Sequence, residues 1–117
     1  MGNDLKLLKI IIKYCKGIEN AVNRFGDDEG VFLEDSDYQY TCSFCITQIG
    51  EAVKRLSPKI TEDHPEIPWN KIAGMRDFIA HEYGNINLNV VWITIDEKIP
   101  ELKYTCEKIL KELETRN

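Results

Sequence analysis

Two side chains in the second half of the sequence have the chemistry needed to handle a phosphate group. Arg76 carries a permanent cation whose forked N–H donors match phosphate oxygens, and His81 can move a proton near neutral pH. On a helical wheel Arg76 falls among apolar neighbours, where an unpaired guanidinium is unfavourable. Two interpretations follow from the residues. Either Arg76 pairs with a carboxylate from another helix while His81 caps its own helix, or the two act together on a phosphate.

The spacing of these residues bears on how they would cooperate. Five residues place Arg76 and His81 about 140° apart on a straight helix, so one copy does not focus both groups well on one phosphate. Two copies across a symmetric dimer could do so. Asn70, Gly74, Asp77 and His81 form a separate polar stripe, in which Gly74 permits the close approach of a second helix. We therefore expect a dimer with this stripe near the two-fold axis.

Apolar residues recur at steps of three and four along most of the chain, which predicts helices. The first helix is expected from about Asp4 to Arg24. The acidic stretch Asp27–Asp37 is interpreted as a solvated connection, within which Ser36 is the expected N-cap of the next helix. That second helix is expected from about Asp37 to Leu56.

The second half of the chain is interpreted in the same way. Pro58–Pro68 contains three of the four prolines and predicts a rigid, non-helical loop. A short helix is expected from about Trp69 to His81, with Gly84 as a stop soon after it. A long helical segment from about Leu88 to Glu114 should kink or break at Pro100. The expected fold is an all-α bundle of four main helices, with residues 1–117 forming a single domain.

The composition restricts the function classes. Fifteen Lys and Arg against twenty Asp and Glu give a formal net charge of −5, which argues against broad electrostatic coating of DNA or an anionic membrane. No targeting segment or membrane span is visible, so the expected location is the cytoplasm without membrane association.

The cysteines and the remaining histidine offer weaker signals. Cys42 and Cys45 form a CxxC pair, but a structural zinc site needs four ligands, and both positions also fit an apolar helical stripe. We therefore interpret them as core residues, and we expect no metal site and no cofactor. A redox or zinc protein is a poor third hypothesis. His64, in the proline-rich segment, is interpreted as a surface residue.

The ordered motifs resemble a known family. Arg76-x4-His81-x-Tyr83 is similar to the motif of the HepT-like toxins, which are small HEPN-domain ribonucleases. Further segments resemble that family in the same order: Ile49-Gly50-Glu51-Ala52, Arg55-Leu56-Ser57, Pro65-Glu66-Ile67-Pro68-Trp69, Ile72-Ala73-Gly74-Met75-Arg76 and Val91-Trp92. The resemblance covers roughly residues 37–102 explicitly.

The resemblance implies an HEPN-type bundle that dimerises and cleaves RNA without metal. By this resemblance His81 would be the general base or acid, and Arg76 would stabilise charge on phosphorus while the 2′-hydroxyl attacks. The residue after the arginine is often Asn in the family and is Asp77 here. Its extra negative charge could orient His81 or weaken the site.

The resemblance also implies regulation. Tyr83 matches the tyrosine that a partner nucleotidyltransferase antitoxin adenylylates, as in a type VII-like toxin–antitoxin pair; the alternative is an aromatic residue that packs beside Arg76. A second hypothesis, from a different class, is a non-catalytic HEPN binding module that assembles with a nucleotidyltransferase subunit.

Overall fold

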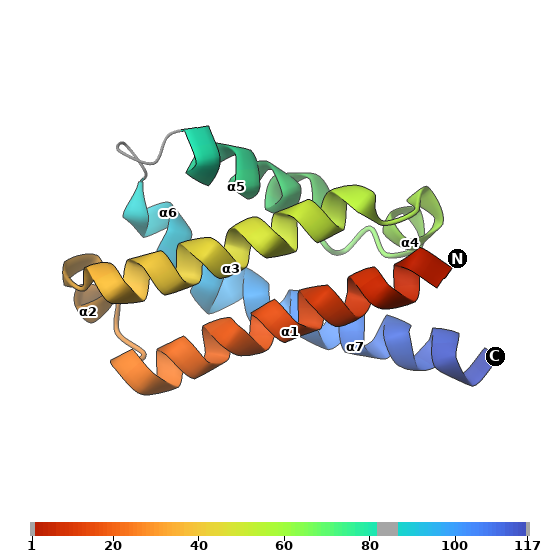
Figure 1. The fold of residues 1–117 in the computed structure, drawn as a ribbon, viewed down its shortest axis with the longest axis horizontal. Helices are drawn as coiled ribbons and strands as arrows, with labels where there is room; N and C mark the ends of the chain where they lie inside the picture. The colour runs from red at the N-terminus through yellow and green to blue at the C-terminus, as the bar shows by residue number, and fades with distance from the viewer. Residues whose placement is uncertain (1, 82–86, 117) are drawn as a thin grey trace.

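The computed structural model describes residues 2–81 and 87–116, apart from the side chains of Phe78, Ala80 and His81. The described residues form helices and no strand, which confirms the all-α fold class. Helix α3 lies at the centre and packs against α1 on one side and α5 on the other, while α7 packs against α1 (Figure 1). These four helices span Gly2–Phe25 (α1), Ser36–Arg55 (α3), Trp69–His81 (α5) and Ile99–Arg116 (α7).

The core is made by the apolar stripes that the sequence periodicity indicates. Each helix turns one face inward, because residues three and four apart lie on the same side of a helix. The stripes of α1, α3 and α7 supply many of the fully buried side chains, among them Leu8, Ile11, Ile18, Tyr38, Ile46, Ile49, Ile99 and Leu102. Burial of these faces fixes the position of α3, and α5 in turn packs against α3.

The acidic connection after α1 contains a helix that the sequence analysis did not predict. Helix α2 spans Glu29–Glu34, and the Asp28 side chain caps it by accepting from the Val31 N–H at 3.1 Å. Phe32 is fully buried and makes an edge contact with Tyr38, with ring centroids 5.0 Å apart. The segment is largely exposed, as expected, but it is helical in part, and one buried aromatic ring anchors it to the core.

The start of α3 also differs by one residue from the expectation. Asp35, not Ser36, is the N-cap, and its carboxylate accepts from the Tyr38 N–H at 3.1 Å. Ser36 is the first residue of the helix itself. Asp and Ser are both good caps, so the sequence alone could not choose between neighbours.

The proline-rich segment is also partly helical. Helix α4 spans Pro58–Asp63, with Pro58 at its start, where the missing N–H is not needed, and with Ile60 buried. The expectation of a wholly non-helical loop was therefore wrong. The buried Asp4 carboxylate accepts from the N–H and the hydroxyl of Ser57, at 3.0 and 2.7 Å, which fixes the α3–α4 junction against α1.

The last helical segment has an irregular turn just before Pro100, whereas a kink or break was expected at Pro100 itself. Helix α6 spans Leu88–Ile93, a π-helical turn η2 covers Thr94–Lys98, and α7 follows from Ile99. Pro100 is the second residue of α7, so its ring and its missing N–H fall on the turn just before it. The irregularity is a single wider turn within a continuous run of helix. In the described part of the chain, no helix is long and apolar enough to span a membrane.

Candidate functional site

Arg76 is placed by an unusually close contact between α3 and α5. A Cβ atom added at Gly50 of α3 would lie 2.6 Å from the Arg76 Cβ, and 3.3 and 3.4 Å from the carbonyl oxygens of Ile72 and Ala73. Only a residue without a side chain fits there. Gly50 therefore lets the backbone of α5 rest on α3 at the position where Arg76 projects.

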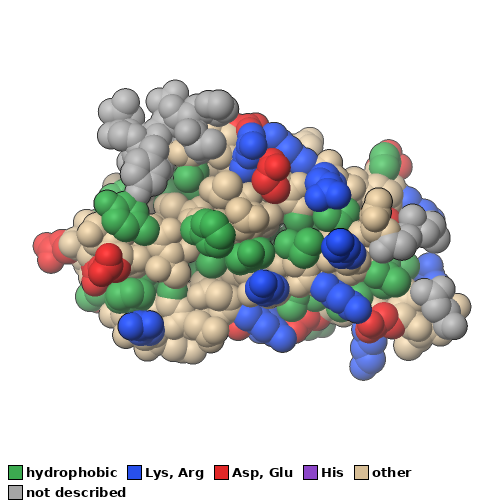
Figure 2. All heavy atoms as spheres, in the orientation of Figure 1, with side chains coloured by type: hydrophobic (Ala, Val, Ile, Leu, Met, Phe, Trp, Pro, Cys, Tyr) green, Lys and Arg blue, Asp and Glu red, His purple; other side chains and the backbone are tan. Residues whose placement is uncertain are grey.

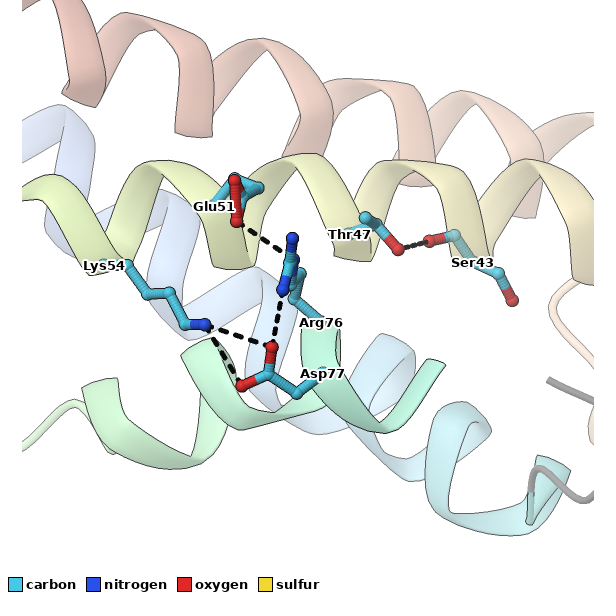
Figure 3. Close-up of polar contacts among 6 residues, drawn as sticks. All are labelled: Ser43, Thr47, Glu51, Lys54, Arg76 and Asp77. Carbon is cyan, nitrogen blue, oxygen red and sulfur yellow. Dashed lines mark hydrogen bonds and ion pairs between the residues drawn. The ribbon is translucent and has the colours of Figure 1, made fainter. Parts of the chain in front are cut away.

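The guanidinium of Arg76 lies in a network of four charged side chains (Figure 3). Its Nε is 2.9 Å from Glu51 Oε1 of α3, and its Nη1 donates to Asp77 Oδ1 at 2.7 Å. Lys54 of α3 donates to both carboxylate oxygens of Asp77, each at 3.1 Å. Two cations and two anions from the facing helices thus alternate, with Asp77 between Arg76 and Lys54.

The network is partly exposed, and its contacts perturb the charged groups. The hydrogen bond from Arg76, followed by the one from Lys54, lowers the pKa of the Asp77 carboxyl below its ordinary value. The same hydrogen bond, and then the charge of Glu51, raise the pKa of Arg76. Although 31% of the Arg76 side chain is exposed, its Nε is buried, and that N–H does not point well enough at Glu51 to form a hydrogen bond. The guanidinium is therefore held by charge at one edge and by a good hydrogen bond at the other.

An open cleft adjoins this network. It has a volume of about 460 Å³ and runs between the end of α3, α4 and the first turns of α5. Lys54 and Asp77 line it together with the exposed residues Asn70 and Gly74, while the buried Trp69 contributes an apolar wall. Nothing lies within 4 Å of a Cβ added at Gly74, so this side of α5 is open. Figure 2 shows that basic and acidic side chains are interleaved on the surface over α3 and α5.

Polar residues continue along α3 beyond Glu51. Thr47 lies one turn away, and its hydroxyl donates to the Ser43 carbonyl at 2.9 Å; Figure 3 shows both on the side of α3 that faces Arg76. Ser43 is buried despite its hydroxyl. This polar row follows α3 in the direction in which α5 runs towards His81.

The structure brings some of the expected site residues together. Arg76 and Asp77 are in contact, and Arg76 also pairs with Glu51 of α3, as the first of the two interpretations proposed for Arg76; the capping role that it gave to His81 stays untested. The backbone of His81 ends α5, but its side chain lies outside the described residues, as do Tyr83 and the expected stop at Gly84. The prediction that Arg76 and His81 act together therefore stays a prediction.

Other candidates lie elsewhere. His64 follows α4 as its C-cap, and its Nδ1 lies 3.6 Å from Glu66 Oε2. It lines a separate cavity together with Asp4 and Ser57. The four cysteines are buried and unpaired, which confirms their interpretation as core residues; burial raises the pKa of Cys42 and of Cys106 to about 12. Among the described residues, no group of three or more His, Cys, Asp or Glu side chains could hold a metal ion.

Two members of the network, Glu51 and Lys54, are not predicted as site residues from the sequence. Glu51 and Lys54 are three residues apart and therefore share a face of α3. That spacing is the signal that could have singled them out. It is common on solvated helix faces, however, and nothing in the sequence aligns α3 with α5.

The described residues form an all-α bundle of the HEPN type, in which Arg76 of α5 is held in a charged network beside an open cleft. The model of the family described as "Ribonuclease HepT-like" matches residues 8–109, and the chain belongs to this family.

Relatives from several organisms cover most of the chain. A protein from Caldanaerobacter subterraneus subsp. tengcongensis, named as an RNase, is 47% identical over 108 residues, which are 89% of this chain and 91% of that protein. A Methanocaldococcus jannaschii protein, also named as an RNase, is 37% identical over 91% of this chain and 90% of its own length. A Thermococcus cleftensis protein named as a ribonuclease HepT is 40% identical over 68% of this chain and 73% of its own. No solved structure matches.

Proposed function

We propose that this protein is an endoribonuclease that cleaves RNA through attack by the substrate's own 2′-hydroxyl. The observation that carries the proposal is the half-buried Arg76, held by Glu51 and by Asp77, which itself lines an open cleft, in a chain of the HepT-like ribonuclease family. RNA carries its own nucleophile, so the protein needs only to move a proton and stabilise charge on phosphorus. No metal or cofactor takes part in the proposed reaction.

The roles divide by chemistry. Arg76 stabilises the charge that develops on the phosphate oxygens, because its donors are already oriented by the contacts around it. His81 takes the proton from the 2′-hydroxyl or gives one to the leaving oxygen. Before RNA binds, Asp77 sets the direction of the Arg76 guanidinium through the 2.7 Å hydrogen bond.

A homodimer would complete the site. On an ideal straight helix, five residues separate Arg76 and His81 by about 140°, so the stripe of Asn70, Gly74, Asp77 and His81 is proposed to face its copy across a two-fold axis. The open side of α5 at Gly74 supports this arrangement, because a second copy could approach there and leave the RNA in one cleft shared by the two copies.

Regulation is proposed to act at Tyr83. A cognate nucleotidyltransferase antitoxin would transfer AMP to its hydroxyl, as in a type VII-like toxin–antitoxin pair. The added phosphate would compete for Arg76 and its bulk would exclude RNA. Growth assays with Tyr83→Phe test this: the variant should still cleave RNA, and an antitoxin that acts only by adenylylation should not neutralise it. Rescue of growth together with an adenylate detected by mass spectrometry on Tyr83→Phe would contradict the assignment.

RNA cleavage by the purified protein tests the main proposal. Cleavage should survive EDTA and leave 2′,3′-cyclic phosphate ends. His81→Ala should lower the rate by about 10²–10⁴-fold with little change in RNA affinity, because it removes only proton transfer. Arg76→Ala should lower both. Abolition of cleavage by EDTA with rescue by Mg²⁺ would refute the mechanism.

One observation favours a second function. Glu51 and Asp77 together neutralise the two cations of the network, which reduces the attraction of the site for RNA. A non-catalytic module that assembles with a nucleotidyltransferase subunit would be compatible with this arrangement. This second function predicts a stable complex with that subunit. It also predicts that wild type and His81→Ala show the same background rate of RNA cleavage.

A further inference from the structure

The contacts of Asp77 single out one oxygen position. Asp77 Oδ1 lies 2.7 Å from Arg76 Nη1 and 3.1 Å from Lys54 Nζ, so donors from two different helices converge on it. A carboxylate oxygen and a phosphate oxygen make the same demands on such donors. The position that Asp77 Oδ1 occupies is therefore a site for an oxyanion, filled in this structure by a side chain of the protein itself.

We infer that Lys54 and Arg76 together bind a phosphate of the substrate, and that Asp77 occupies their shared oxyanion position until that phosphate displaces it. The inference rests on the proposed function in naming RNA as the source of the phosphate. It adds Lys54 to the residues that bind substrate and gives Asp77 a second task, that of an internal competitor.

The charges of the network favour such an exchange. Lys54 and Arg76 are balanced by Glu51 and Asp77, so a further anion finds no net attraction while Asp77 remains. A phosphodiester carries one negative charge, as the carboxylate does, and replacing one with the other keeps the balance. The Asp77 side chain is 46% exposed, so it has water to turn into.

The adjoining cleft gives the rest of the nucleotide a place. Lys54 and Asp77 form part of the lining of this 460 Å³ space, so a phosphate between Lys54 and Arg76 would lie at its edge. The volume is within the usual range of about 300–1,000 Å³ for small-molecule sites. The exposed Asn70 amide lines the same cleft and can hydrogen-bond to the edge of an unpaired base, the way in which proteins usually read RNA sequence.

A titration with inorganic phosphate tests the site without relying on cleavage. Phosphate is added against chloride at constant ionic strength, and binding is followed by NMR at the amides of Lys54, Asn70 and Asp77. Asp77→Asn should bind phosphate about 2- to 5-fold more tightly than wild type, which is the range of an exposed ion pair. Lys54→Ala should bind it more weakly by a similar factor. The gain from Asp77→Asn should shrink in the Lys54→Ala background, because the two residues act at one position.

Matched controls separate this exchange from a general change in charge. Lys9 and Glu114 form an exposed pair on α1 and α7, 3.9 Å apart. Glu114→Gln removes the same charge as Asp77→Asn, and Lys9→Ala the same charge as Lys54→Ala. Both controls should leave phosphate binding and RNA cleavage unchanged.

The outcomes distinguish the inference from the proposed function. Equal gains from Asp77→Asn and Glu114→Gln, or wild-type affinity in Lys54→Ala, would overturn the shared oxyanion site even if RNA is cleaved. Binding of phosphate as expected, in a protein that cleaves no RNA, would uphold the site and overturn the proposed function. The same variants, tested with a 2′-O-methyl RNA that cannot be cleaved, should keep the same order of affinity.

Discussion

Replacing Gly50 with Ala should separate the two helices that carry the site. The new Cβ would lie 2.6 Å from the Arg76 Cβ, about 1 Å short of the roughly 3.5–4.0 Å at which carbon atoms rest in contact. The Arg76 Cβ is fixed to its helix, and the other two close atoms are the backbone oxygens of Ile72 and Ala73. Because no flexible side-chain end can yield, α5 must move away from α3 by about the missing distance.

The size of the effect follows from two opposing contributions. Overpacking of this kind costs about 1–3 kcal/mol, while Ala in place of a helical Gly returns about 0.5–1 kcal/mol. The expected net loss of stability is about 0–2.5 kcal/mol, with a central value of about 1 kcal/mol, or a fall in Tm of about 4 °C and at most about 10 °C for a chain of this size. Displacement of Arg76 by about 1 Å should reduce RNA cleavage by up to about 10²-fold at temperatures where the variant is folded.

Thermal unfolding and cleavage rates should be measured together, with Gly17→Ala as the control. That substitution also adds a methyl group between helices, but its Cβ would meet the Cys45 Sγ at 3.1 Å, where α1 contacts α3 and not where α5 does. We expect Gly17→Ala to lower Tm less and to keep its activity. A rise in Tm for Gly50→Ala, or full activity, would refute the reasoning that the close approach at Gly50 positions Arg76.

Three further outcomes follow from the described contacts. The folded-state pKa of Asp77 lies below its ordinary 3.8. Wild type should therefore have a larger free energy of unfolding in urea than Asp77→Asn above pH 3.8, and should lose this advantage as the pH falls through the folded pKa. An advantage that persists at lower pH would contradict this. Burial raises the pKa of the Cys42 and Cys45 thiols. Ellman's reagent at pH 8 should therefore leave the native protein unmodified and react with all four cysteines only after denaturation. Rapid reaction of Cys42 or Cys45 in the native protein would contradict this. Gly74→Ala should leave the fold intact, since nothing lies within 4 Å of the added methyl, but should weaken the proposed dimer in light scattering; unchanged self-association would move the two-fold axis away from Gly74.

The short helices show what sequence periodicity cannot detect. Helices α2 and α4 have six residues each, too few to show a repeating apolar face, and each forms around one buried side chain, Phe32 or Ile60. Burial of a single residue depends on which other segments lie nearby. The same holds for the choice of Asp35 over Ser36 as the cap of α3.

The sequence by itself determined the long helices and the setting of Arg76. Apolar steps of three and four define α1, α3, α5 and α7, because the period of a helix is a local property of the chain. The position of Arg76 among apolar neighbours on α5 follows from the same local geometry, which left a carboxylate partner and a phosphate as the two alternatives. The family motif could also be found in the sequence, because it is defined by the number of residues between its members along the chain.

Only the tertiary structure decided which residues complete the site. Lys54 reaches Asp77 across 23 residues of sequence, and Glu51 reaches Arg76 from the same helix. Their contacts depend on the register of α3 against α5, which Gly50 sets by removing a side chain at the crossing. Register between helices is a property of packing, and for that reason neither the partners of Arg76 nor the shared oxygen position could be derived from residue spacing alone.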